Sequence, residues 1–197
     1  MRKIIAIAVS TGGPKALQSI IPFLPAELDE PIIVVQHMPK GFTASLADRL
    51  NSISRIRVCE PDEGEVIENG CVYIARAGMH FNLVQKGKNT VVHYSDEPNR
   101  EGVKPCANYM YESLAKCRYD KVICVVMTGM GADGTAGIRN LKDSGQKMHV
   151  ITQSGETCVV NGMPGACVKA GLSDEEIALT NISEKLTQLV GVNSNGC

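Results

Sequence analysis

The sequence predicts an α/β protein with a three-layer, mainly parallel, doubly wound sheet and an antiparallel hairpin at one edge. Apolar runs of strand length alternate with amphipathic helical patterns along most of the chain. Such alternation is typical of a parallel sheet covered by helices on both faces. The hairpin is indicated by two alternating runs, 80–85 and 90–94, which a short glycine-containing turn joins.

The strands are expected in short segments rich in apolar and β-branched residues. They are Lys3–Val9, Pro31–Val35, Arg55–Cys59, Cys71–Ala75, His80–Gln85, Thr90–Tyr94, Lys121–Met127 and Met148–Thr152. Each run is far shorter than the apolar stretch that a membrane-spanning helix needs.

Helical patterns lie between many of these strands. The first, Pro14–Leu24, follows a Gly-Gly turn and carries proline near its first position, where proline is favoured. In Thr43–Leu50 the apolar residues Leu46 and Leu50 recur at helical spacing, and Thr43 or the turn before it is expected to cap this helix. The other expected helices are Tyr109–Lys116, Thr135–Lys142, Pro164–Ala170 (with Gly171 as its C-cap) and Ile182–Val190.

Length and composition predict one cytoplasmic domain over residues 1–192, with a disordered tail at 193–197. A chain of 197 residues suits a single α/β domain, and the N-terminus lacks the pattern of a signal peptide. The formal net charge is −1 and aromatic residues make up 4%, which disfavours a nucleic-acid-binding surface.

The cysteines are expected to be reduced and mainly structural. They stand at 59, 71, 106, 117, 124, 158, 167 and 197, and none forms a Cys-x-x-Cys pair. This spacing fits neither a disulfide framework nor a zinc site. Cys71, Cys124 and Cys158 lie in apolar, strand-like stretches, where cysteine acts as a small hydrophobic residue.

Three polar side chains follow predicted strands and form the candidate active site. Ser10 ends the first strand, His37 follows the second, and Asp133 lies just beyond the strand 121–127. The carboxyl ends of parallel strands line the crevice in which ligands bind. A histidine held by a carboxylate can take the proton of a serine hydroxyl, so the three residues predict a catalytic triad.

Each of these residues also has an ordinary structural explanation. Ser10 could cap the first helix, His37 could be a hydrogen-bonded structural histidine, and Asp133 could be a turn residue. His80, His93 and His149 are expected to be structural. Gly12 and Gly13 could bind a phosphate, but the glycine patterns of nucleotide-binding loops are absent. The co-occurrence of the three residues after strands favours catalysis.

Longer motifs resemble the catalytic domain of the CheB chemotaxis protein-glutamate methylesterases. They are S-T-G-G-P at 10–14, V-V-Q-H-M-P-K-G-F-T at 34–43, V-Y-I-A at 72–75, G-M-H at 78–80, M-T-G-M-G-A-D-G at 127–134 and C-V-V-N-G-M-P at 158–164. The resemblance runs in order from about residue 3 to about residue 190. It implies hydrolysis of glutamate γ-methyl esters on chemoreceptor helices, with release of methanol, and deamidation of certain receptor glutamines.

The resemblance also implies roles for individual residues. Ser10 would be the nucleophile, His37 its general base, and Asp133 the residue that orients His37. The N–H of Met130 and the turn Ser10–Gly13 would stabilise the oxyanion, with Thr11 beside them. Such a triad supplies its own base and oxyanion site, so neither a metal nor an organic cofactor is expected. The rate should fall as the pH drops through the titration of His37.

Several positions differ from the usual family pattern. Ala8 and Val9 precede the serine where glycine and alanine are frequent, and Arg76 stands in a segment that is usually A-P-G-G. Cys106 and Asn108 stand where P-S-V-D is common, and the loss of that aspartate is expected to remove a charge from the receptor-facing rim. Family members usually carry a receiver domain before this region, which could be supplied elsewhere or be missing from the chain.

Two other functions remain open at this point. One is an inactive binding or scaffold domain of the same fold, and the other is an esterase or amidase for a small molecule. An open crevice at Ser10 would favour a protein substrate, whereas a deep, narrow pocket would favour a small one.

Overall fold

The computed structural model describes residues 1–191, and the tail expected at 193–197 lies outside this range. Its main sheet has the order β3-β4-β2-β1-β7-β8-β9, and every neighbouring pair is parallel. These strands are β1 (Lys3–Val9), β2 (Ile32–Gln36), β3 (Arg57–Cys59), β4 (Cys71–Ile74), β7 (Lys121–Val126), β8 (Met148–Gln153) and β9 (Glu175–Ile177). The predicted parallel sheet is confirmed.

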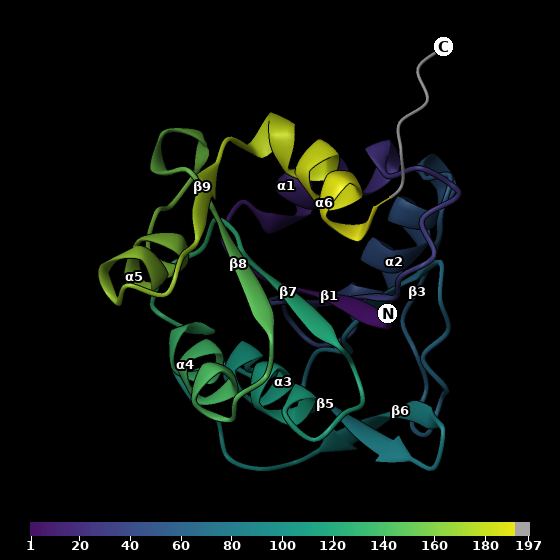
Figure 1. Ribbon diagram of the computed structural model, residues 1–197. Coiled ribbons are helices and arrows are strands. Elements are labelled where there is room, and N and C mark those ends of the chain that lie inside the picture. Colours follow the sequence, from purple (N-terminus) through teal and green to yellow (C-terminus); the bar gives the residue numbers. More distant parts are fainter. Residues whose placement is uncertain (192–197) are drawn as a thin grey trace.

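Helices cover both faces of this sheet (Figure 1). One face carries α1 (Gly13–Gln18), α2 (Phe42–Ile53) and α6 (Ile182–Val190), whose apolar side chains pack on β1, β2 and β7. The other face carries α3 (Ala107–Leu114), α4 (Thr135–Asp143) and α5 (Met163–Lys169). Short 3₁₀ turns lie at η1 (Ile21–Phe23), η2 (Gly155–Thr157) and η3 (Leu179–Asn181). The result is the expected three-layer α/β fold.

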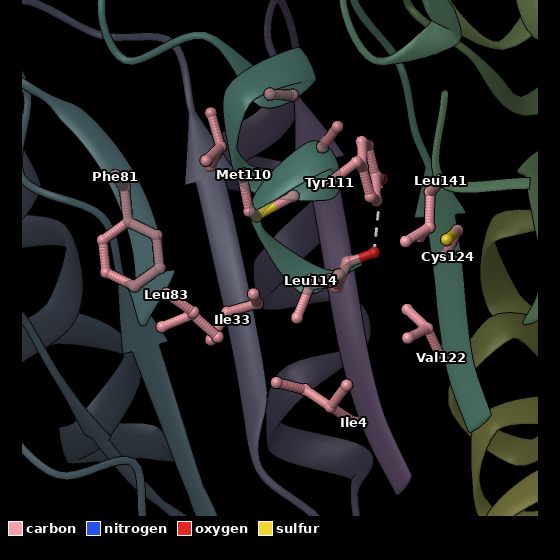
Figure 2. Packing of buried hydrophobic residues seen from close by; sticks show 14 of the residues in the cluster. Ile4, Ile33, Phe81, Leu83, Met110, Tyr111, Leu114, Val122, Cys124 and Leu141 are labelled. Atoms are coloured by element: carbon pink, nitrogen blue, oxygen red, sulfur yellow. Dashed lines mark hydrogen bonds between the residues drawn. The ribbon is translucent and has the colours of Figure 1, made fainter. Parts of the chain in front are cut away.

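The core strands are apolar along their whole length because both faces of the sheet are covered. In β1, every residue from Ile4 to Val9 is fully buried. On one face, Met110, Tyr111 and Leu114 point from α3 toward the strands that carry Ile4 and Ile33, as Figure 2 shows. The two apolar layers hold the central strands rigidly, so the loops that leave them start from fixed positions.

The predicted hairpin is confirmed and forms a two-stranded sheet of its own. Its strands are β5 (His80–Lys86) and β6 (Asn89–Ser95), paired in antiparallel register around the turn at Gly87. Phe81, Leu83 and Val92 join the same apolar cluster as α3. The hairpin therefore lies beside the main sheet and packs on its helical layer instead of extending the row of strands.

Three details differ from the sequence expectations. The first helix ends at Gln18, and a separate 3₁₀ turn contains Pro22, which lacks the N–H that a continuous helix would require. The strand β9 was not expected because Glu175–Ile177 is short and polar. Cys158 lies after η2 and not in a strand. The seven cysteines that the structure describes are free thiols.

The chain order around β1 makes a topological switch point in the sheet. The strand β2 lies on one side of β1, and β7, reached much later in the sequence, lies on the other. In doubly wound folds ligands bind outside the carboxyl ends of the strands at such a switch point. The residues that follow β1, β2 and β7 therefore meet at one place.

Candidate active site

Ser10 and His37 are neighbours because of the strand register. Val9 and Gln36 are paired residues of β1 and β2, and Ser10 and His37 are the residues directly after them. The His37 N–H donates to the carbonyl oxygen of Val9 at 3.1 Å, and the Ser10 N–H donates to the Thr128 carbonyl at 2.9 Å. The ends of all three central strands are thus tied together by main-chain hydrogen bonds.

His37 and Asp133 form a direct side-chain hydrogen bond. The Nε2 atom of His37 lies 2.7 Å from Oδ2 of Asp133. The His37 side chain is 10% exposed and that of Asp133 only 3%. A carboxylate can only accept, so Nε2 carries the proton and the lone pair of the neutral ring lies on Nδ1.

Asp133 is held as a carboxylate by several donors. Its oxygens accept hydrogen bonds from the Cys106 thiol at 3.0 Å and from the main-chain N–H groups of Ala107 at 2.6 Å and Asn108 at 3.0 Å. Burial alone would raise the pKa of Asp133, but the bonds from His37, Cys106 and Ala107 outweigh it, and the pKa is lowered. The residue is therefore a fixed negative charge beneath His37.

The Gln36 side chain joins the serine and histidine loops. Its Nε2 donates to the carbonyl oxygen of Ser10 at 3.0 Å and to that of His37 at 2.8 Å. A side chain on Gly13 would overlap Oε1 of Gln36, so the glycine leaves the space that Gln36 occupies. Gln36 thereby sets the relative position of the two loops.

Ser10 does not cap the first helix. The N-cap of α1 is Gly12, which has a φ of 82° and receives no side-chain hydrogen bond. The Ser10 side chain is partly exposed at the crevice, and within residues 1–191 its hydroxyl makes no hydrogen bond to His37. The structural explanation by capping is thus wrong, and Ser10 lies beside the His37–Asp133 pair with its hydroxyl available.

The turn around Ser10 also offers main-chain donors. In the described part of the chain, the N–H groups of Thr11, Gly12 and Met130 make no hydrogen bond, whereas that of Gly13 donates to the Ser10 carbonyl at 2.8 Å. Gly129 brings the second loop against the serine, since a Cβ there would lie 2.7 Å from the Ser10 Cβ. Of the expected oxyanion donors, Gly13 is thus occupied and Met130 is not.

The surface around the Ser10 turn is open to solvent. Thr11 is exposed, and the residues Met130 and Val159 are 74% and 67% exposed. A pocket of about 210 Å³ adjoins the turn and is lined by Gly12, Thr128 and Val159, among others. Ser10 does not line this pocket. A bulky substrate could therefore approach the serine from solvent.

Sequence reasoning missed the residues that support the site. The sequence motifs indicate no role for Gln36, and Cys106 stands out in them only as a departure from the usual family pattern. The expectation that Asn108 affects a charge at the rim is wrong, because Asn108 is fully buried between α3 and α4. These contacts join residues that are far apart in the chain. The sequence contains no signal for them beyond the fact that the residues involved are polar.

The other histidines are structural, as expected. His80 is fully buried, with Nδ1 accepting from the Cys106 N–H at 3.2 Å and Nε2 donating to the Pro98 carbonyl at 3.1 Å. His93 and His149 contact surface carboxylates. No group of three or more His, Cys, Asp and Glu residues within 1–191 is placed to hold a metal ion. No helix in that range is long and apolar enough to cross a membrane.

Comparison with known proteins identifies relatives of this chain. The family model described as CheB methylesterase matches residues 5–186. The protein-glutamate methylesterase/protein-glutamine glutaminase of Bacillus subtilis is 47% identical over 96% of this chain and 53% of its own length. The protein of the same name from Geobacillus kaustophilus is 45% identical over 95% of this chain and 54% of its own. The chain thus spans about half the length of these curated relatives.

A solved structure extends the likeness to the fold. The crystal structure of the Thermotoga maritima CheB methylesterase catalytic domain superposes with a TM-score of 0.91 at 40% identity. The match covers 96% of this chain and 99% of the other. Together with the family match over nearly the whole sequence, this means that the chain belongs to the CheB methylesterase family.

Proposed function

We propose that this chain is a serine esterase that hydrolyses glutamate γ-methyl esters on the cytoplasmic helices of chemoreceptors and deamidates certain receptor glutamines. The observation that carries the proposal is the 2.7 Å hydrogen bond between His37 and Asp133, located where Ser10 leaves the neighbouring strand. The names of the 45–47% identical relatives, protein-glutamate methylesterase/protein-glutamine glutaminase, agree with it.

The first chemical step is attack of the serine on the ester. As Oγ of Ser10 bonds to the ester carbonyl carbon, its proton passes to Nδ1 of His37, the ring nitrogen left unprotonated by the bond to Asp133. Asp133 stabilises the imidazolium that forms. The negative charge on the carbonyl oxygen is stabilised by the N–H of Met130 and of the turn after Ser10.

The second half of the reaction regenerates the enzyme. The tetrahedral intermediate expels methoxide, which takes the proton from His37 and leaves as methanol. Water then gives a proton to His37 and attacks the acyl-enzyme carbonyl. The second tetrahedral intermediate expels Oγ of Ser10, which takes the proton back from His37, and glutamate is released. With a glutamine substrate the same steps release ammonia in place of methanol.

The open rim favours a helix of a protein as the substrate over a small molecule. Thr11 and Met130 are exposed, and Ser10 does not line the neighbouring pocket. The family usually carries a receiver domain before the catalytic domain. We propose that such a domain, if it acts with this chain, regulates access to this surface and takes no part in the chemistry.

Methanol release tests the proposal directly. A methyl-esterified receptor signalling domain would be incubated with the chain and with Ser10→Ala. We expect release by the unsubstituted chain and a loss of about 10⁴-fold or more with Ser10→Ala. Equal release by both would contradict the esterase proposal, and hydrolysis of small esters alone would favour the small-molecule alternative. Binding of the receptor with no turnover would favour the scaffold alternative.

A further inference from the structure

We propose that Cys106 is a positioning residue of the reaction, whose thiol keeps the Asp133 carboxylate oriented toward His37. The inference rests on the proposed function, since it assigns a role within the same site. Cys106 lies 27 residues before Asp133, at the N-cap of α3, and its side chain is fully buried. Because it is fully buried, it is not exposed to a substrate that approaches from solvent.

The thiol contact is unusually close for this protein. The Sγ atom of Cys106 lies 3.0 Å from Oδ1 of Asp133. Other thiols that contact main-chain oxygens in the described residues do so at longer distances, such as 3.7 Å from Cys117 to Leu83 and 3.7 Å from Cys158 to Gln153. A charged acceptor shortens and strengthens a hydrogen bond, so the Cys106 contact differs in kind from the others.

The two carboxylate oxygens have different partners. Oδ2 accepts from His37 and from the Ala107 N–H, whereas Oδ1 accepts from the thiol and from the Asn108 N–H. Each oxygen thus has two donors, which fix the plane of the carboxylate. Without the thiol, Oδ1 would keep one donor, and the carboxylate could rotate away from the His37 ring.

The Cys106 thiol remains protonated near neutral pH. Burial and the adjacent Asp133 charge raise the pKa of Cys106 to about 12. The Arg100 guanidinium is the other charged group that Cys106 influences, and Tyr111, which Asp133 influences, is neutral because burial raises its pKa well above the usual value. Cys106 is therefore a constant donor and not a second nucleophile.

Cys106 is itself held by His80. The Cys106 N–H donates to Nδ1 of His80, and the opposite ring nitrogen donates to the Pro98 carbonyl. The His80 ring is fully buried and packs on Tyr109 with their centroids 4.5 Å apart. The residue that carries the thiol is therefore anchored from the hairpin side, which explains how one side chain can orient a carboxylate.

The test compares Cys106→Ala and Cys106→Ser. The alanine variant should lose about tenfold in kcat with KM changed less than about twofold, because a hydrogen bond to a charged group is lost inside the site while the rim is untouched. Its acid limb in the pH–activity profile should move to lower pH, since a carboxylate that has turned away from the His37 ring stabilises the protonated imidazole less. Serine should restore both values, because its hydroxyl also donates.

The matched control is Cys117→Ala. This thiol is also buried and lies just beyond the other end of α3, where it contacts main-chain oxygens only. Its removal should leave kcat and the pH profile unchanged while costing similar thermal stability. Equal activity losses in the two alanine variants, or a tenfold loss without any movement of the acid limb, would overturn the proposed role.

A measurement without substrate separates this inference from the proposed function. The ring resonances of His37 would be followed by NMR across pH in the unsubstituted chain, Cys106→Ala and Cys106→Ser. A midpoint displaced downward only in the alanine variant supports the positioning role, even if no receptor ester is hydrolysed. Coincident midpoints in all three proteins would overturn it, whatever the turnover of the unsubstituted chain.

Discussion

At the scale of single residues, the site depends on keeping one buried carboxylate charged. Removing Asp133 from water disfavours its charged form, and an unpaired buried charge is strongly destabilising. The structure offsets this with donors from His37, Cys106 and two main-chain N–H groups. The arrangement explains why the pKa of Asp133 is lowered despite its burial.

The lowered pKa of Asp133 predicts a pH-dependent contribution to stability. A carboxyl whose pKa is lower in the folded state stabilises the fold above its unfolded value of about 3.9, and the contribution disappears as the pH falls through the folded value. Asp133→Asn should therefore cost roughly 1–3 kcal/mol near pH 7 and progressively less below about pH 4. Urea unfolding of both proteins between pH 3 and pH 7 measures this. A difference that is constant over the range would contradict the assignment.

Gly13 is predicted to be intolerant of a side chain because of Gln36. An added Cβ would overlap the Gln36 amide and displace it from the Ser10 and His37 carbonyls, and it would also crowd Val9. Gly13→Ala should destabilise the protein by about 1–3 kcal/mol and reduce turnover. Chemical unfolding and a kinetic assay measure the two effects.

A double-mutant cycle separates that overlap from a general helix effect. In a Gln36→Ala background the main obstruction is gone, so Gly13→Ala should cost less stability than in the unsubstituted chain. Additive losses from the two substitutions would show that Gln36 is not the residue that Gly13 accommodates.

At the scale of elements, α3 and α4 are joined by one buried side chain. Oδ1 of Asn108 in α3 accepts from the N–H groups of Gly134 at 3.0 Å and Gly137 at 2.6 Å, at the start of α4. Because Asp133 directly precedes this helix start, the contact also fixes where the carboxylate lies. The other amide atom, Nδ2, has no partner among the described residues.

This contact predicts an ordering of two substitutions. Asn108→Ala should cost about 2–4 kcal/mol, because two buried main-chain donors lose their acceptor. Asn108→Asp should cost less, since it keeps an acceptor for both donors and removes the unpartnered amide N–H groups. Thermal unfolding of the two variants measures which of them loses more stability. An aspartate variant less stable than the alanine variant would contradict this account of the contact.

The helices and strands differ in how accurately the sequence predicts their existence and their ends. The ends of β1 and α6 agree with the residues expected, since long apolar or amphipathic patterns define them. By contrast, the sequence of β9 (Glu175–Ile177) has no strand pattern. This segment is a strand because its main chain pairs with the neighbouring strand β8. The helix α1 ends before Pro22, because proline has no N–H to donate to a continuing helix. The apolar spacing over residues 14–24 nevertheless favours one long helix, so the pattern alone predicts the wrong end.

At the scale of the whole molecule, the topology explains the site. Ser10, His37 and Asp133 come from three different parts of the chain, and the order of the central strands brings their loops to one end of the sheet. Polar residues after apolar strands were sufficient to predict this meeting. The supporting contacts of Gln36 and Cys106 were not predictable, because they depend on side-chain packing between distant segments.

Covalent labelling of Ser10 tests the central claim most directly. The unsubstituted chain, Ser10→Ala and His37→Gln would be treated with a fluorophosphonate probe, and the labelled peptide would be identified by mass spectrometry. We expect one adduct on Ser10 in the unsubstituted chain, none in Ser10→Ala, and labelling slowed at least a hundredfold in His37→Gln. An adduct on another residue, or equal labelling of all three proteins, would contradict the assignment of Ser10 as a nucleophile activated by His37.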